Sequence, residues 1–328
     1  MPGGLGKVGQ LANRRVAISI ALFSGMLVLA LAIRVFVAGG WTLEAAMLEL
    51  RVHRAIVGVV VGASLAIGGV FLQCLMRNQL ASPDLIGLAS GAGLAVMAGE
   101  YLAKTSGELG ENVLANAALA MLGSALSLAT VWGLAQKRRM MEPVSLILIG
   151  VIVGLVCSAM TMLLQHLMPG QGESTRRWLL GSLDDGARTW ALWSGGGLCV
   201  LFSVMGTVWW RRLDAMTMAE DEARSLGVNV RHMRQFLFIG AGVLAAIAVV
   251  LAGPIGFVGL ACPHVARLCA GPSHRWLIVL SAIAGMVLVV SADSVVKMLD
   301  LQAGRLPLGV LTTFIGGPVL ISMLRRGR

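Results

Sequence analysis

Long apolar stretches, separated by short polar segments, recur along the whole chain. By window length we identify ten of them, and most reach the roughly 20 residues that an α-helix needs to cross a bilayer. The predicted spans are 16–38, 53–76, 84–103, 112–135, 143–167, 190–210, 234–252, 258–270, 275–297 and 307–325. No soluble domain of ordinary size fits between them. The pattern predicts an all-α polytopic membrane protein in which residues 1–328 form a single transmembrane domain.

The region of the eighth predicted span carries residues that disturb a helix. They are Gly253, Pro254, Gly256, Pro263 and His264. A break at membrane depth is tolerated only where protein or a water-filled cavity covers the freed backbone groups, and such breaks are typical of transporters. The range 258–270 is also short for a full crossing. We therefore expect a broken or half helix near 253–270, and a translocation pathway rather than a passive anchor.

Composition supports a membrane protein and argues against a nucleic-acid-binding protein. The chain is 57% hydrophobic and 13% charged, with a mean hydropathy of +0.84. Its net charge of +10 does not indicate nucleic-acid binding, because the Lys and Arg residues lie in short loops between spans, where the positive-inside rule places them. Counting those loops predicts that both termini are cytoplasmic and that most acidic residues lie outside.

The longest polar stretch on the predicted cytoplasmic side is 213–233. Asp214 or the Thr217 hydroxyl can cap a short helix there, acidic residues follow in its first turn, and Gly227 ends it. On composition alone, a docking element and a plain connector are equally good interpretations.

Enzyme and metal motifs are absent from the sequence. It contains no phosphate-binding loop, no zinc-protease motif and no nucleophile elbow. Cys262, His264 and Cys269 are close enough to raise a metal site, but free Cys is commonly a small buried hydrophobe and Pro263 disrupts helical spacing. We expect no metal and no ATP hydrolysis by this chain, and therefore no enzyme.

One acidic residue, Asp293, lies clearly inside a predicted span. An intramembrane carboxylate is a candidate for a proton or ion path. Lys297 lies one helical turn away on the same face, so a structural ion pair is an equally good interpretation.

Several blocks of sequence, in order along the chain, identify a family. They are 51–54 (RVHR), 77–87 (RNQLASPDLIG), 178–183 (WLLGSL), 223–228 (ARSLGV), 253–260 (GPIGFVGL) with 263–267 (PHVAR), 292–293 (AD) and 306–312 (LPLGVLT). In these blocks the chain resembles the permease subunits of ABC importers for iron-siderophores, haem and cobalamin, the FecCD-type permeases. The resemblance covers nearly the whole chain.

The resemblance implies partners as well as a fold. Such permeases have about ten helices and pair with an identical or sister permease around the pathway. Two ATPase subunits bind ATP and Mg²⁺ and dock on the cytoplasmic loop between the sixth and seventh spans, which favours docking for 213–233. The implied ATPase-coupling residues are Glu220, Ala223, Arg224, Leu226 and Gly227. A periplasmic substrate-binding protein delivers cargo to the outer face.

The resemblance also implies binding-protein docking residues and a gate. The basic residues assigned to docking are Arg51, Arg54, Lys297 and Arg305; the family's second docking position falls at Met298. The cytoplasmic gate matches Asn78, Leu80, Pro143 and Val144. Pro143 and Val144 are apolar, so we expect a constriction that closes by dewetting.

The resemblance favours a permease of an ATP-driven importer that moves a ferric siderophore across the bacterial inner membrane by alternating access. Cobalamin and haem remain alternative cargos. An ion-coupled secondary transporter that uses Asp293 and Lys297, and a scaffold or sensor subunit that moves nothing, remain alternative functions.

Overall fold

The computed structural model describes the backbone of residues 3–37, 45–106, 113–137, 140–141, 143–168, 179–183, 189–299 and 306–326. Within these residues, a helix occupies each predicted span. These helices are α1 (Gly3–Ala32) with its π-helical continuation η1 (Ile33–Val37), α2 (Ala45–Met76), α3 (Leu88–Thr105), α4 (Val113–Ala135), α5 (Pro143–Leu167), α7 (Thr189–Val208), α10 (Val230–Ala252), α11 (Val258–Ala270), α12 (His274–Met298) and α13 (Leu308–Arg326).

Shorter elements connect the long helices. They are η2 (Pro83–Ile86), α8 (Trp210–Met216), α9 (Glu220–Ser225) and a small antiparallel ribbon of β1 (Gln136–Lys137) and β2 (Met140–Met141). In the described part of the chain, 7 helices are long and apolar enough to cross a membrane, whereas α11 and the apolar start of α13 are shorter. The prediction of an all-α polytopic membrane protein is confirmed, with about ten apolar helices.

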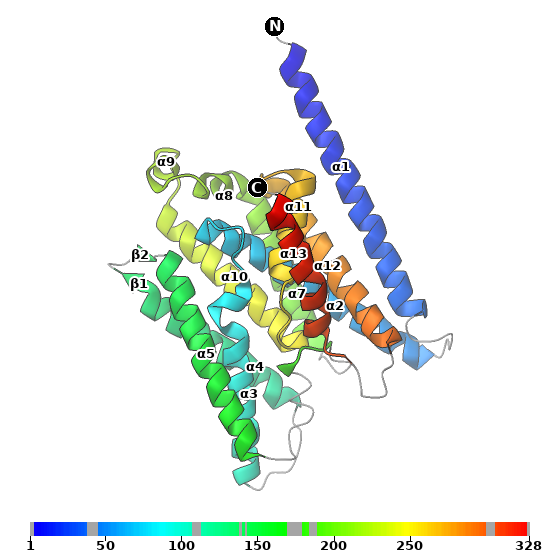
Figure 1. Cartoon of the computed structure of the whole chain (residues 1–328), viewed down its shortest axis with the longest axis vertical. Helices are drawn as coiled ribbons and strands as arrows, with labels where there is room; N and C mark the ends of the chain where they lie inside the picture. Colours follow the sequence, from blue (N-terminus) through cyan, green and yellow to red (C-terminus); the bar gives the residue numbers. More distant parts are fainter. Residues whose placement is uncertain are drawn as a thin grey trace.

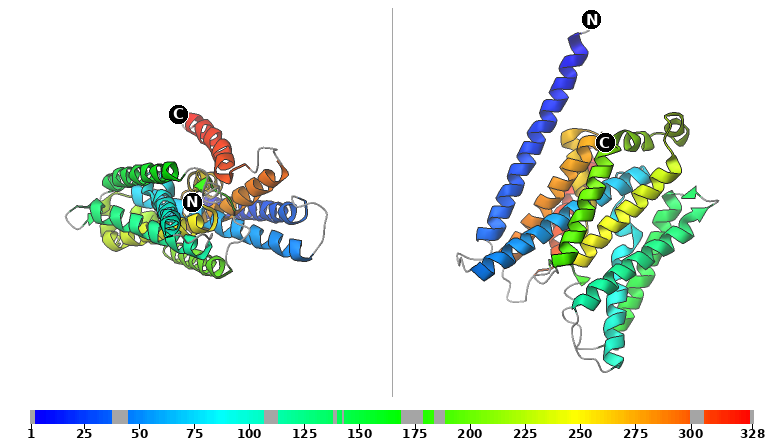
Figure 2. Two further views of the ribbon diagram at one scale, coloured as in Figure 1. Left: turned by 90° about the horizontal axis from the view of Figure 1, so that it is seen from below. Right: turned by 180° about the vertical axis from the view of Figure 1, so that it is seen from behind.

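The helices run side by side, with α1 at one edge of the bundle (Figures 1 and 2). The beginning of α1, the end of α13, and helices α8 and α9 all lie at one end of the molecule (Figure 1). We call this the α9 end; α2 begins and α12 finishes on the opposite side, which we call the distal side.

Helix α2 passes through the middle of the bundle, and glycines let two neighbours approach it closely. A Cβ on Gly62 would lie 2.3 Å from the carbonyl oxygen of Gly285 in α12, and one on Gly69 would lie 1.9 Å from that of Gly259 in α11. Side chains at these contacts would force the backbones apart. Packing therefore explains these glycines.

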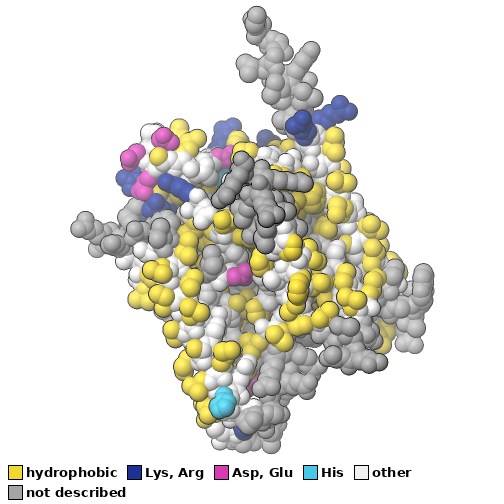
Figure 3. Space-filling model, viewed as in Figure 1, with side chains coloured by type: hydrophobic (Ala, Val, Ile, Leu, Met, Phe, Trp, Pro, Cys, Tyr) yellow, Lys and Arg dark blue, Asp and Glu magenta, His cyan; other side chains and the backbone are white. Residues whose placement is uncertain are grey.

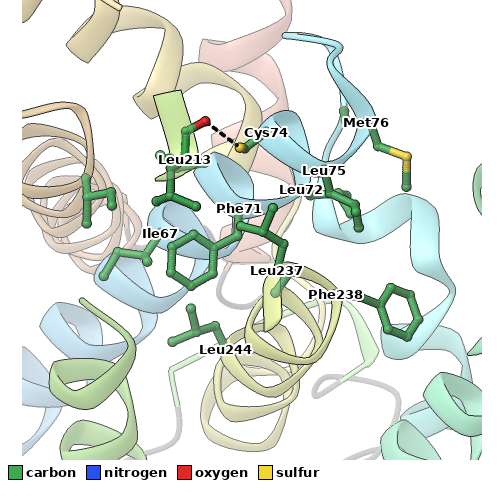
Figure 4. Close-up of a cluster of buried hydrophobic side chains, with 14 of the residues drawn as sticks. Ile67, Phe71, Leu72, Cys74, Leu75, Met76, Leu213, Leu237, Phe238 and Leu244 are labelled. Atoms are coloured by element: carbon green, nitrogen blue, oxygen red, sulfur yellow. Dashed lines mark hydrogen bonds between the residues drawn. The ribbon is translucent and has the colours of Figure 1, made fainter. Parts of the chain in front are cut away.

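Aromatic side chains fill the core near the α9 end. The ring of Phe71 on α2 lies 5.4 Å from that of Phe236 on α10, and the ring of Trp209 lies 4.8 Å from Phe236. Beside them, Cys74 donates a hydrogen bond of 3.5 Å to the carbonyl of Leu213 in α8 (Figure 4). Helices α2, α8 and α10 thus share one packed core.

The outer surface of the bundle is apolar between two polar ends. Leu155 on α5 and Val208 on α7 are among many exposed hydrophobic side chains, and Figure 3 shows hydrophobic side chains over the middle of one face with charged ones gathered at the α9 end. A surface of this kind is solvated by lipid tails rather than by water.

Candidate functional site

Three irregular segments meet inside the bundle: 77–87, 179–183 and 253–257. Two contacts with α2 show their depth. A Cβ on Gly68 would lie 3.6 Å from Pro83 Cγ, and one on Gly58 would lie 3.4 Å from Leu183 Cδ1. Both glycines are well within the apolar stretch Met47–Met76, so non-helical backbone lies at membrane depth.

The backbone groups freed by these breaks bind one another. The amide of Ser182 donates to the carbonyl of Ala252 at 2.9 Å, and the amide of Leu308 donates to that of Gly181 at 2.8 Å. Gly181 has φ +79°, and a Cβ there would lie 2.3 Å from the carbonyl oxygen of Pro254. Mutual hydrogen bonding meets the requirement that buried peptide groups be paired, and only glycine fits at position 181.

Asp84 on η2 covers the start of the half-helix α11. Its carboxylate accepts a hydrogen bond from Ser82 Oγ at 3.0 Å and one from the backbone amide of Phe257. Phe257, the N-cap residue of α11, has φ +67°, an uncommon value for a residue with a side chain. A carboxylate at this position also complements the positive end of the helix dipole.

Pro263 lies inside α11 without ending it. Proline has no N–H, so the carbonyl of Gly259 loses its usual donor, and the Nε2 of Gln73 approaches that carbonyl at 3.4 Å instead. The Oε1 of Gln73 in turn accepts from Arg267 Nη2 at 3.0 Å. The predicted break is therefore confirmed at 253–257 but not at Pro263, and His264 continues the helix.

Sequence reasoning missed Gln73. The signal was present, because Gln73 is a polar residue inside the apolar span 53–76, but the sequence does not show which carbonyl it would bind.

The Nδ1 atom of His264 is buried and has no hydrogen-bond partner in the structure.

The segment predicted to couple to the ATPase, 213–233, contains the end of the short helix α8 and the whole of α9, at the α9 end (Figure 1). Neither Asp214 nor Thr217 caps α9, so that expectation is wrong. The N-cap is Ala219, whose amide donates to Glu222 Oε2 at 3.3 Å. Gly227 follows the helix with φ +77°, and its amide donates to the Arg224 carbonyl at 2.9 Å, which confirms the predicted end.

The five implied coupling residues lie together on α9 and the turn after it, but they face different ways. Leu226 is 63% exposed, and Arg224 and Gly227 are also exposed. Ala223 is fully buried. Glu220 bonds Arg224 at 2.7 Å and the buried Arg234 of α10 at 2.8 Å. The exposed part of α9 and its following turn is therefore centred on Leu226, while Ala223 and Glu220 fasten α9 to the bundle.

Helix α8 is fastened to α2 and α12. Arg77 Nε donates to the Met216 carbonyl at 2.8 Å. Asp214 Oδ1 accepts from the backbone amide of His274 at 2.8 Å and lies 2.6 Å from its Nδ1, and Asp214 Oδ2 accepts from Ser273 Oγ at 3.0 Å. Asp214 thus caps α12.

These contacts also change the acidity of Asp214. Partial burial by itself raises the pKa of this carboxyl, but the hydrogen bonds and charge of His274, with the hydrogen bond from Ser273, outweigh it and lower the pKa below its ordinary value.

Two of the predicted gate residues lie in the turn that leaves α2 at the α9 end. Asn78 and Leu80 are exposed, and the Leu80 amide donates to Asn78 Oδ1 at 2.9 Å. Arg77, just before them, has φ +50°. Pro143 begins α5, while the side chains of Pro143 and Val144 lie outside the described residues.

Three of the basic residues predicted to dock a binding protein, Arg51, Arg54 and Lys297, lie on the distal side, in different environments. Arg54 is only 5% exposed, and its Nη2 donates to Asp293 Oδ1 at 2.8 Å. Arg51 is half-buried and donates to the Val35 carbonyl at 3.3 Å. Lys297 is half-buried, and Arg305 lies outside the described residues. Because its side chain is buried, Arg54 is not accessible to a binding protein in this structure.

Asp293 is 1% exposed and forms ion pairs with two arginines, Arg34 of η1 and Arg54 of α2. Asp293 therefore takes part in ion pairs, and both arginines lie on helices that are far from α12 in the sequence. The cluster joins η1, α2 and α12 on the distal side.

Within the described residues, no group of three or more His, Cys, Asp or Glu side chains is placed to hold a metal ion. Cys262 and Cys269 are free thiols. The described residues thus form a membrane helix bundle whose helix breaks, at membrane depth, are hydrogen-bonded to one another. The short helix α9 is exposed at one end of this bundle.

Comparison with known proteins agrees with this geometry. Residues 13–326 match the FecCD transport family. The chain is 34% identical over 279 residues to the cobalamin import system permease protein of Halobacterium salinarum, covering 84% of this chain and 72% of that one. It is 32% identical over 297 residues to the hemin transport system permease protein of Yersinia pestis, covering 86% and 83%. It is 33% identical over 283 residues to the Fe(3+)-citrate import system permease protein of Bacillus subtilis, covering 84% and 81%.

Among solved structures, the chain resembles an inward-facing metal-chelate type ABC transporter, with a TM-score of 0.80 and 27% identity over 94% of this chain and 99% of that one. The family match over nearly the whole length, the relatives above 30% identity and the shared fold lead to one conclusion: the chain belongs to the FecCD transport family, as a permease subunit of an ABC importer.

Proposed function

We propose that this permease moves a ferric siderophore across the bacterial inner membrane, from a periplasmic binding protein, by alternating access. Fe(3+)-citrate is named in the description of one relative and a metal-chelate type transporter in that of the structural neighbour, which supports a metal chelate as cargo. Cobalamin, named for another relative, and haem are the alternative cargos.

The observation that carries the proposed coupling is the form of α9. It is a six-residue helix whose exposed Leu226 projects from a base held by the Glu220–Arg234 ion pair, while α8 is held by Arg77 and Asp214. A short helix rigidly joined to several long ones can transmit a displacement into the bundle. We propose that two ATPase subunits dock here, and that nucleotide shifts the permease between states because the partner binds those states with different affinities.

The proposed orientation places the α9 end in the cytoplasm. Basic residues exposed at this end include Arg211, Arg212, Arg231 and Arg275, as the positive-inside rule requires. The distal side then faces the periplasm, with Arg51, Lys297 and Arg305 proposed as contacts for an acidic binding protein. A second permease, identical or sister, completes the pathway.

Uptake of radioactive iron tests the cargo and the coupling together. Cells lacking this chain are complemented with wild type, with Leu226→Asp, or with His232→Asp, which adds the same charge at another exposed position of the α9 end. We expect uptake of at least one ferric siderophore with wild type and His232→Asp, and a loss of about tenfold or more with Leu226→Asp, which corresponds to about 1.4 kcal/mol of docking affinity.

The outcomes separate the proposals. If cobalamin or haem is imported and no ferric siderophore is, the cargo proposal fails while the coupling proposal stands. If Leu226→Asp imports normally, docking at α9 is wrong and ion coupling becomes the leading mechanism.

A further inference from the structure

Asp84 is an exposed carboxylate in a place where a charge is costly. It follows Pro83, whose Cδ lies 2.7 Å from the position of a Cβ on Gly259, and Pro83 also packs on Gly68 within the apolar stretch of α2. The Asp84 side chain is nevertheless exposed on the surface of the subunit. It therefore lies at membrane depth without being enclosed by its own chain.

The charge of Asp84 is not neutralised by a basic side chain. In the part of the chain that the structure describes, no Lys, Arg or His side chain forms an ion pair with Asp84, unlike Asp293, Glu220 and Asp214. Its partners are a hydroxyl and a backbone amide, from Ser82 and Phe257. Lipid tails cannot solvate such a group, and intramembrane carboxylates almost always face a bundle interior or a water-filled cavity.

The surroundings of Asp84 are polar on the open side. A Cβ on Gly256 would lie 3.8 Å from Asp84 Oδ2 and 3.8 Å from Thr313 Oγ1 of α13, and Thr313 is itself exposed. The bare backbone of the helix break lies between these two side chains. A carboxylate, a hydroxyl and unshielded peptide groups thus share one surface at membrane depth, whereas α1, at the edge of the bundle, presents Val28, Leu29 and similar side chains.

From this placement we propose that the Asp84 carboxylate lines the translocation pathway and makes it select neutral or cationic chelates, or chelates rich in hydrogen-bond donors, over anionic ones. The inference deepens the proposed function, since it states the charge class of the cargo. A unit charge about 8 Å away at an effective dielectric constant of about 20 changes an equilibrium constant roughly thirtyfold. In a pair of permeases, two such charges would face the pathway.

Asp84 also caps α11, so a useful variant must separate its charge from its hydrogen bonds. Asp84→Asn keeps a carbonyl oxygen that accepts from Phe257 and Ser82 but removes the charge. Ser82→Ala is the matched control, because it removes one hydrogen bond to the carboxylate and keeps the charge.

The test measures the local potential directly, in the assembled importer in proteoliposomes. Thr313→Cys supplies a thiol beside Asp84, and its rates of modification by a cationic and an anionic methanethiosulfonate are compared with and without ATP. Wild type corrects for its own five free cysteines, and Val28→Cys reports an apolar position on α1, at the edge of the bundle. We expect the cationic reagent to react faster at Thr313→Cys, and Asp84→Asn to reduce the ratio of the two rates about tenfold.

Two results would overturn the proposal: no modification of Thr313→Cys in either nucleotide state, or a rate ratio that Asp84→Asn leaves unchanged. A ratio that falls equally in Ser82→Ala would also overturn it, since the effect would then be structural. The assay requires no cargo, so a failure of the ferric-siderophore proposal is distinguishable from a failure of this one. For the cargo itself, Asp84→Asn should raise uptake of anionic chelates relative to cationic ones by a similar factor.

Discussion

The buried cluster of Arg34, Arg54 and Asp293 predicts a large loss of stability when the charge of Asp293 is removed. Asp293 is 1% exposed and Arg54 is 5% exposed, and Arg54 Nη2 lies 2.8 Å from Asp293 Oδ1. Asp293→Asn removes the charged carboxylate that both buried guanidinium groups bind. Breaking a buried pair in this way costs about 3–5 kcal/mol, a large share of the roughly 5–15 kcal/mol that stabilises a typical native domain.

The arginines are predicted to be less critical one at a time. Arg54→Met leaves the neutral pair of Arg34 and Asp293, and Arg34→Met leaves that of Arg54 and Asp293. Both should therefore unfold at temperatures between those of wild type and Asp293→Asn. The triple variant Asp293→Leu, Arg34→Met, Arg54→Met removes these three charges together, and replacing a buried ion pair or triad by apolar side chains is often neutral or stabilising.

The assay is thermal unfolding of the purified protein in lipid nanodiscs, with siderophore uptake measured in parallel. The reasoning is refuted if Asp293→Asn unfolds at the wild-type temperature, or if the triple variant is as unstable as Asp293→Asn. A triple variant that is stable and imports cargo excludes an ion path through Asp293. One that is stable but imports nothing would instead favour the ion-coupled mechanism.

Two further predictions concern helix packing and pH. Gly69→Ala adds a methyl group 1.9 Å from the Gly259 carbonyl oxygen and should destabilise the protein by about 1–3 kcal/mol. The control Gly197→Ala, where a Cβ would have nothing within 4 Å, should be neutral or slightly stabilising. Equal melting temperatures for the two variants would contradict the packing argument. Asp214 has a pKa lowered from its ordinary 3.8, so its contacts with His274 stabilise the fold above about pH 4 and are lost as pH falls through the lowered value. Asp214→Asn should therefore cost about 1 kcal/mol near pH 7 and flatten the acid side of a melting-temperature profile, and a profile parallel to that of wild type would count against this role.

Much of the membrane architecture follows from the order of residues along the chain. A run of about 20 apolar residues has few ways to satisfy its backbone in lipid other than a helix, so each predicted span contains a helix in the structure, and 258–270 matches α11 at both ends. The break at 253–257 could also be predicted from the sequence, because glycine and proline act through the backbone of their own segment. Gly227 ends α9 for the same local reason.

Contacts between distant segments were decided only by the tertiary structure. Asp293 had Lys297 as its visible neighbour along the helix, yet Arg34 and Arg54 bind it because α1 and α2 pack against α12. Asp214 was expected to cap the helix next to it and instead caps α12. Sequence spacing records what lies one turn away, whereas partners more than 200 positions apart, such as Arg54 and Asp293, depend on how the helices pack.

The same distinction applies to the functional surfaces. The sequence by itself determined that the chain is a polytopic membrane protein with a broken helix and a polar segment at 213–233, since each of these is a local property. Only the tertiary structure decided that Ala223 faces inward while Leu226 faces outward, that Gln73 binds the carbonyl freed by Pro263, and that Asp84 lies at membrane depth beside the break. Burial and hydrogen-bond pairing arise from packing between segments, and the pattern of one segment does not contain them.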